Sequence, residues 1–90
     1  MEDDRPRVTI LYFAWLRERV GLAQEEMELP AWVGTVGELM EWLAARSARH
    51  GAAFENLAVV RCADNQDFAD VSAPVRPGDE VAFFPPVTGG

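Results

Sequence analysis

The chain has 90 residues, 49% of them apolar, and a formal net charge of −7. This length fits one compact domain and is too short for two independent cores. An acidic surface does not attract a phosphate backbone, which argues against nucleic-acid binding. Such a surface either fits a basic patch on a protein partner or only keeps a small domain soluble.

Cysteine content and the first residues indicate a cytoplasmic location. Cys62 is the single cysteine, so one chain cannot form an internal disulfide or a multi-cysteine metal or iron–sulfur site. The opening residues, MEDDRPR, are acidic, and no apolar run approaches the length of a membrane span. We therefore expect a cytoplasmic protein that binds no metal and does not enter a membrane.

The first third of the chain predicts two strands. Residues 8–14 read VTILYFA, apolar on both faces, as in a strand with neighbours on both sides. A helical turn over 15–21 is expected to end at Gly21. The weak alternation over 24–29 then predicts an edge strand, closed by Pro30.

A helix is predicted to begin at Thr35. Its hydroxyl can accept from the Glu38 amide while the Glu38 side chain reaches back, which forms a capping box. The apolar residues that follow have the spacing of one helical stripe that covers a sheet: Val36, Leu39, Met40 and Leu43. We expect this helix to run to Gly51, with Arg46, Arg49 and His50 in its last turn.

The apolar run over 57–63 predicts a third strand. Alternation places Ala58, Val60 and Cys62 on one face, which favours a buried, inert thiol. A catalytic pair of Cys62 with His50 is the less favoured alternative, because sequence spacing alone cannot show its geometry.

Two weaker elements and a turn follow. Residues 68–75 form a poorer strand, which Pro74 confines to an edge or a bend. Pro77-Gly78 fits the central positions of a type II turn. A final short strand is expected over 80–84.

This order of elements predicts an α+β fold. We expect a mixed sheet of about five strands with one main helix packed across one face, as in the ubiquitin-like β-grasp. The organisation is a flexible acidic leader (1–6), the domain (7–84) and an extended mobile tail (85–90).

The tail reads PPVTGG. Pro85 and Pro86 remove amide donors and end strand pairing. Six extended residues reach roughly 20 Å, and Gly89 and Gly90 let the backbone enter a narrow channel in another protein. The alternative is a frayed terminus with accidental glycines.

Chemistry at the tail needs a second protein. A free carboxylate is a poor electrophile and is usually activated by transfer of AMP from ATP. The side chains of this sequence offer no means to do so. The chain would then be the substrate of an activating enzyme and a carrier of the activated group.

Three segments resemble the ubiquitin-like sulfur carriers that form the small subunit of molybdopterin synthase: RVTILYFAWLRERVG, TVGELMEWLAARSA and PGDEVAFFPPVTGG. The third is the most specific, because turn, strand, double proline and terminal double glycine occur together. The leader MEDDRP and the segment ADNQDFADVSAPV depart from the family pattern.

The resemblance implies a chemistry. A ubiquitin-activating-like adenylyltransferase uses ATP to adenylate Gly90, which then becomes a thiocarboxylate. The tail enters the large synthase subunit and gives sulfur to cyclic pyranopterin monophosphate, usually in a heterotetramer. The chain itself binds no cofactor and is not catalytic alone.

Strand faces predict a docking surface. If one face of the first and last strands covers the helix, then Leu11, Phe13, Ala82 and Phe84 point the other way, and one helix cannot cover both faces. Alternatively, loops cover this face. We expect partner contacts from three face residues and five tail residues: Leu11, Phe13, Phe84, Pro85, Pro86, Val87, Thr88 and Gly89.

Three other functions stay open. The related sulfur carrier of thiamin synthesis also ends in two glycines but lacks the FFPPV approach. A protein modifier would join Gly90 to lysines of other proteins. A non-catalytic binding module would have an idle tail.

Overall fold

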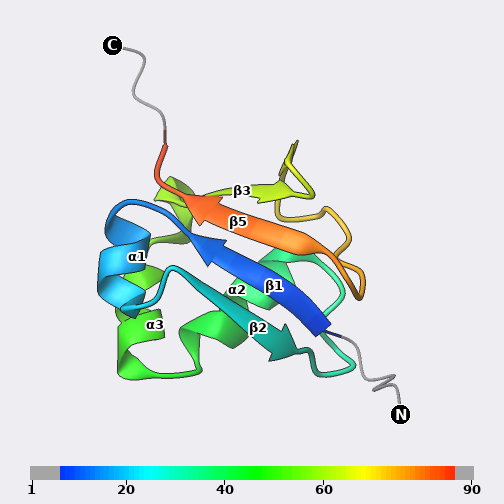
Figure 1. Cartoon of the computed structure of the whole chain (residues 1–90), viewed down its shortest axis with the longest axis horizontal. Helices are drawn as coiled ribbons and strands as arrows, with labels where there is room; N and C mark the ends of the chain where they lie inside the picture. Colours follow the sequence, from blue (N-terminus) through cyan, green and yellow to red (C-terminus); the bar gives the residue numbers. More distant parts are fainter. Residues whose placement is uncertain (1–6, 87–90) are drawn as a thin grey trace.

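The computed structural model describes residues 7–86 (Figure 1). In chain order its elements are β1 (Arg7–Tyr12), α1 (Trp15–Val20), β2 (Gln24–Glu28), α2 (Val36–Ala44), α3 (Ala48–Ala53), the 3-10 helix η1 (Leu57–Val59), β3 (Arg61–Asp64), β4 (Asp67–Ala69) and β5 (Glu80–Phe84). The predicted leader and the tail residues Val87, Thr88, Gly89 and Gly90 lie outside the described residues.

The five strands form one mixed sheet in the order β2-β1-β5-β3-β4. β1 and β5 run parallel to each other, and the other neighbouring pairs are antiparallel. α2 passes behind the strands, and α1 and α3 pack together beside one end of the sheet (Figure 1). The predicted α+β β-grasp fold is confirmed, with two short helices in addition to the main one.

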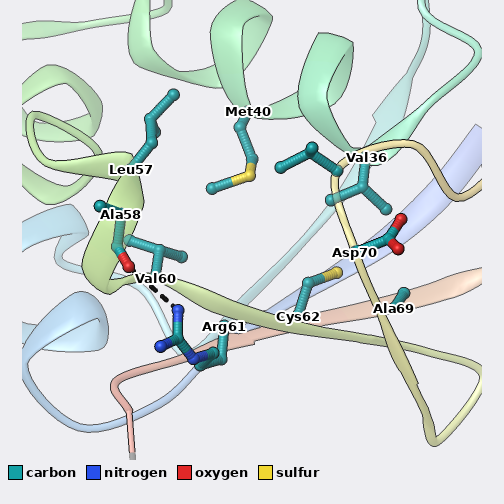
Figure 2. Close-up of a pocket in the computed structure, with 10 residues that line it drawn as sticks. Val36, Met40, Leu57, Ala58, Val60, Arg61, Cys62, Ala69 and Asp70 are labelled. Carbon is teal, nitrogen blue, oxygen red and sulfur yellow. Dashed lines mark hydrogen bonds between the residues drawn. The ribbon is translucent and has the colours of Figure 1, made fainter.

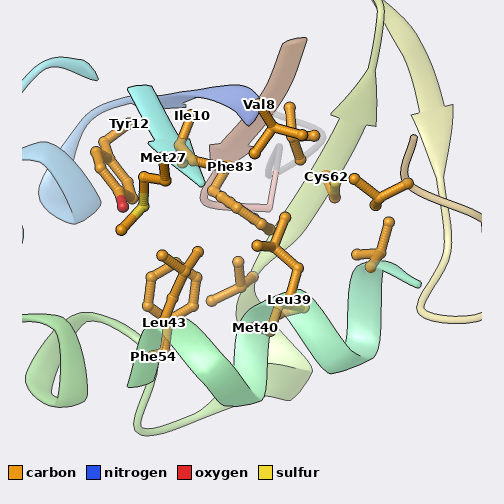
Figure 3. Packing of buried hydrophobic residues seen from close by; sticks show 14 of the residues in the cluster. Val8, Ile10, Tyr12, Met27, Leu39, Met40, Leu43, Phe54, Cys62 and Phe83 are labelled. Atoms are coloured by element: carbon orange, nitrogen blue, oxygen red, sulfur yellow. The ribbon is translucent and has the colours of Figure 1, made fainter. Parts of the chain in front are cut away.

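The inner face of the sheet carries the core. Alternate residues of the two parallel strands are almost completely buried: Val8, Ile10, Tyr12, Val81 and Phe83. Phe83 lies between the sheet and the stripe of α2, and the Phe54 ring meets it edge-on with 5.1 Å between the ring centroids (Figure 3). Leu39, Met40 and Leu43 of that stripe are buried as predicted.

The start of α2 is capped as expected, with one difference. The Thr35 hydroxyl accepts from the Glu38 amide at 3.2 Å. The Glu38 carboxylate does not bind the Thr35 amide but accepts from the amide of Gly34 at 2.9 Å. The reciprocal half of the cap therefore lies one residue earlier than the capping box places it.

The prediction of one helix up to Gly51 is wrong. α2 ends at Ala44, and a second helix, α3, begins after Ser47, whose hydroxyl accepts from the His50 amide at 3.1 Å. Serine is a good N-cap, so Ser47 starts a new helix after α2 has ended with Ala45 as its C-cap. Gly51 lies within α3, and Arg46 lies in the link between the helices.

This break brings His50 into a buried polar cluster. His50 Nε2 lies 2.7 Å from a Glu25 carboxylate oxygen, and the Tyr12 hydroxyl donates to the same oxygen at 2.7 Å. Ser47 Oγ lies 2.8 Å from His50 Nδ1. Burial, and then the hydrogen bond to Glu25, raise the pKa of Tyr12 above its ordinary value. The cluster ties β1, β2 and α3 together.

Gly21 ends α1 as predicted. It takes a φ of 89°, and its amide donates to the Arg17 carbonyl at 2.8 Å, a common helix termination. The Arg49 guanidinium donates to the carbonyls of Val20 at 3.1 Å and Glu18 at 3.4 Å. A β-carbon at Gly21 would lie 2.7 Å from this guanidinium, so glycine suits both the turn and the packing.

The predicted strand over 57–63 is wrong in its first half. Leu57–Val59 form η1, because the Asn56 side chain accepts from the Ala58 amide at 3.2 Å and starts a helical turn. β3 begins only at Arg61. Ala58 is therefore exposed and does not share a face with Val60 and Cys62, which are buried.

The predicted strand over 68–75 is right at its start and wrong beyond it, because β4 ends at Ala69 and the chain then turns, with the Ala73 amide donating to the Asp70 carbonyl at 3.1 Å. β4 is an edge strand, and Pro74 forms only an isolated bridge with Thr35.

The Pro77-Gly78 turn is confirmed. Gly78 has a φ of 90°, and the Asp79 amide donates to the Arg76 carbonyl at 3.1 Å, as a type II turn requires.

An acidic pair lies where the β3–β4 turn meets the start of β5. Asn65 donates to Asp79 at 3.0 Å and accepts from the Glu80 amide at 2.9 Å. Burial would raise the pKa of Asp79, but hydrogen bonds from the Arg76 amide and the Asn65 side chain outweigh it and lower that pKa. Burial raises the pKa of Asp64 to about 6, and the Asp79 carboxylate adds to the rise.

We expect Asp64→Asn to become more stable relative to the original chain as the pH rises. Below the ordinary carboxyl pKa of 3.8, Asp64 is neutral in both the folded and the unfolded chain. Its favourable contribution to the fold is complete there and is lost as the pH rises through about 6, because the unfolded chain then releases the proton more readily. Asparagine stays neutral and avoids this loss.

Urea unfolding at pH 4 and pH 7.5 measures the effect. Glu55→Gln, which changes an exposed carboxylate between α3 and η1, is the control. An equal stability difference between Asp64→Asn and the original chain at both pH values would contradict this assignment.

Candidate docking face and carrier tail

β5 holds the root of the tail at the centre of the sheet. On one side the Phe13 amide donates to the Phe83 carbonyl at 3.0 Å, and on the other Arg61 pairs in register with Phe84. Pro85 and Pro86 follow, half-buried and without amide hydrogens. Strand pairing therefore stops at Phe84, and the chain leaves from the end of the sheet where β1 also ends (Figure 1).

The face of the sheet opposite the helices carries an apolar patch. Leu11, Ala82 and Ala63 lie side by side on three neighbouring strands, and all are half-buried. The Phe13 side chain is 48% exposed, so the described loops do not cover it. We call this surface the outer patch and define it by six residues: Leu11, Phe13, Ala63, Phe68, Ala82 and Phe84.

Sequence reasoning missed two members of the outer patch, Ala63 and the aromatic Phe68. The Phe68 side chain is 84% exposed, and its ring centroid lies 5.9 Å from that of Phe84. In the sheet it pairs with Ala63. The signal was the turn before it: Asn65 and Gln66 both take positive φ, as in a type I′ hairpin turn. Recognising that hairpin would have placed Phe68 beside Phe84.

Polar residues border the outer patch on the β2 side. Gln24 pairs with Leu11, and Glu26 pairs with Thr9, on the same face of the sheet. Glu26 also forms an exposed ion pair with Arg7 at 3.2 Å. Charges along an edge strand discourage pairing with other chains. An apolar patch with a polar rim is typical of a surface that binds another protein.

The comparisons with known proteins agree with this geometry. The ThiS family model matches residues 10–90. The chain is 42% identical to the molybdopterin synthase sulfur carrier subunit of Escherichia coli (strain K12), over 92% of this chain and 99% of that protein. The chain belongs to the ThiS family.

Solved structures of similar proteins share the fold. A putative molybdopterin converting factor subunit 1 from Pyrococcus furiosus superposes with a TM-score of 0.75 at 31% identity, covering 91% of this chain and 99% of that one. Small archaeal modifier protein 1 from Haloferax volcanii gives 0.71 at 26% identity, covering 93% and 99%.

A complex of subunits 1 and 2 of the molybdopterin-converting factor from Helicobacter pylori also shares the fold. Its matching chain gives a TM-score of 0.63 at 24% identity, covering 93% of this chain and 99% of that one.

The ThiS family match includes both parts of the candidate site. It spans the outer patch and the whole predicted tail, including Gly90. Among the predicted contact residues, the structure places Leu11, Phe13 and Phe84 on the outer patch and Pro85 and Pro86 at its edge. The other predicted tail contacts lie outside the described residues.

The reactive side chains of this ThiS family chain lie away from solvent. Cys62 is 5% exposed, and burial, with a smaller effect of the Asp64 charge, raises the pKa of its thiol to about 12. His50 binds Glu25 and Ser47 rather than Cys62. The inert thiol is confirmed, and the Cys–His pair is wrong.

One cavity lies under β3 and β4, beside α2. Its volume is about 310 Å³, and Val36, Met40, Val60 and Cys62 line it (Figure 2). At its mouth the Arg61 guanidinium donates to the Ala58 carbonyl at 3.0 Å. The wall is mainly apolar, and within residues 7–86 no cluster of His, Cys, Asp and Glu could hold a metal ion. In the same range no helix is long and apolar enough to cross a membrane.

Cys62 is expected to resist thiol reagents while the chain is folded. A thiol must ionise and be accessible to react, and this one is buried with a pKa of about 12. Labelling with iodoacetamide at pH 8 should be slow in buffer and fast in urea. Equal labelling rates in both conditions would contradict the buried, unreactive thiol.

Proposed function

We propose that this chain is the sulfur carrier subunit of a molybdopterin synthase, with Gly90 as the residue that bears the sulfur. The proposal depends mainly on one observation, that three features occur together in the same part of the molecule. A central strand is held on both sides, it ends beside an exposed aromatic surface, and it continues into PPVTGG. The relative at 42% identity, which bears this function in its name, supports it.

Activation begins at the Gly90 carboxylate. One of its oxygens attacks the α-phosphate of ATP in a ubiquitin-activating-like adenylyltransferase, and pyrophosphate leaves. A sulfur nucleophile then forms a bond to the acyl carbon, AMP leaves, and a thiocarboxylate results. The described side chains supply no catalyst for these steps, since the thiol and the imidazole are buried. The chain acts as substrate and carrier, in the cytoplasm.

The tail and the outer patch then act together on the large subunit. Binding at the patch fixes the position of β5, and the six residues after Phe84 reach about 20 Å into the partner. Glycine at the tip allows close approach to cyclic pyranopterin monophosphate, which receives the sulfur. The Helicobacter pylori complex of subunits 1 and 2 supports a large-subunit partner, and we expect a heterotetramer.

A protein modifier is the second candidate. The similarity to small archaeal modifier protein 1 favours it, because the same activated tail can transfer to an amine instead of accepting sulfur. The two functions differ in the acceptor of the acyl group and share the activation step.

Deleting Gly90 should abolish sulfur transfer to the pterin while leaving the free energy of unfolding unchanged. The deletion leaves the terminal carboxylate on Gly89, about 3.5 Å short of its original reach, and the sheet ends at Phe84. The measurement is molybdopterin formation by a mixture of carrier, activating enzyme, sulfur source and large subunit. A variant with one residue added after Gly90 is the matched control and should also be inactive. Full activity of either variant would refute a carrier role for Gly90.

Phe68→Ala and Phe84→Ala should each weaken binding to the large subunit by about tenfold or more, as loss of an aromatic contact at an interface centre does. Calorimetric titration measures the affinity. Trp32→Ala removes an exposed aromatic outside the outer patch and is the control, with unchanged affinity expected. If the Phe variants bind as tightly as the control, the outer patch is not the docking face.

A further inference from the structure

The sequence contains no lysine. All eight of its cationic residues are arginines. Lysine has a nucleophilic amine in its neutral form, whereas the arginine guanidinium stays protonated in proteins and does not attack acyl groups. Every arginine within residues 7–86 is exposed. A lysine at any of these positions would be open to an activated acyl group.

The other strong nucleophiles occur once each, and the fold buries all of them. Cys62, His50 and Tyr12 are the only cysteine, histidine and tyrosine, and their exposures are 5%, 8% and 2%. The Tyr12 hydroxyl and His50 Nε2 both bind Glu25. Cys62 lies on the inner face of β3, in register with Phe83, opposite the outer patch.

Several arginines form contacts for which the planar guanidinium is well suited, namely paired hydrogen bonds and stacking on aromatic rings. Arg49 binds two carbonyls at the end of α1 with two of its nitrogens. Arg19 and Arg46 lie over the rings of Trp15 and Trp42, 4.5 and 4.9 Å from the centroids. The surface thus keeps its positive charges and their packing without a reactive amine.

Arg61 is the position at which a lysine would lie nearest to the start of the tail. It pairs in register with Phe84, the last strand residue before the tail. The tail is six residues long and can extend about 20 Å, so Gly90 can reach back to position 61. A link of a few residues gives an effective concentration in the millimolar range, so an amine at position 61 would compete with external acceptors.

We propose that the side chains of the folded chain are inert toward its own activated C-terminus: its surface cations are all arginines, and its only thiol, imidazole and phenol are buried, so a side-chain amine or thiol that accepts the acyl group lies on a partner. The inference rests on the proposed function, since an unactivated carboxylate needs no such protection. It applies equally if the chain modifies proteins. In that case one copy could not be attached to a side chain of another copy, so chains of linked copies would not form.

A chemically prepared thioester of Gly90 with 2-mercaptoethanesulfonate tests this without the activating enzyme, so that the inference and the proposed function can fail separately. In self-acylation, a side-chain nucleophile would form a bond to the Gly90 carbonyl carbon, the carbon–sulfur bond would break, and the thiol would leave with the proton. The full-length protein is kept dilute at pH 8, and intact mass and tandem mass spectrometry locate any internal bond.

The original chain should form no bond between Gly90 and a side chain, and its thioester should hydrolyse to the free acid. Arg61→Lys should give an internal amide at position 61, with a mass one water below that of the acid, and Arg61→Gln should not. In urea, the thioester of the original chain should also transfer to the exposed Cys62 thiol.

Two results would overturn the inference. The first is an internal bond from Gly90 to any side chain of the folded original chain. An ester at Ser47 is the sharpest case, because that exposed hydroxyl lies 2.8 Å from His50 Nδ1. The second is the absence of the internal amide in Arg61→Lys, which would show that arginine at this position prevents nothing.

Discussion

The parallel pairing of β1 with β5 is the constraint on which the rest of the structure depends. It brings the first strand of the domain beside the last one. β3 closes the other side of β5, so the strand that precedes the tail is held along its whole length. A carrier that delivers its own terminus needs the start of its tail fixed to the domain. The position that the last residue can reach in a partner then depends only on how the domain binds and on the length of the tail.

The same two strands supply residues to both faces of the sheet, to the core on one face and to the outer patch on the other. Alternation sends Tyr12 and Phe83 into the core and Leu11 and Phe84 to the outer patch. A one-residue slip of either strand would exchange core and docking residues. One register therefore sets both the core and the outer patch, and α2 behind the strands and α1 and α3 beside one end of the sheet leave the outer patch available (Figure 1).

Local signals were enough to predict much of the fold. The Thr35 cap, the Pro77-Gly78 turn and the alternation in β1 each depend on neighbouring residues, and the structure has them where the sequence indicates. The break between α2 and α3 was missed although the Ser47 cap is local, and the contact of His50 with Glu25 that follows from it joins residues far apart in the sequence. Phe68 was missed because its place beside Phe84 needs the β3–β4 hairpin and the sheet order together. The tail chemistry stays a prediction that depends only on the order of residues along the chain, PPVTGG.

The most direct test of a carrier role for Gly90 is the intact mass of the protein after incubation with ATP, a sulfur source and its activating enzyme. A sulfur carrier should gain a mass equal to the replacement of one oxygen by sulfur, located at Gly90 by fragmentation. An unchanged mass, under conditions in which a known carrier of the family is converted, would contradict the carrier function and favour a binding module that uses the outer patch alone.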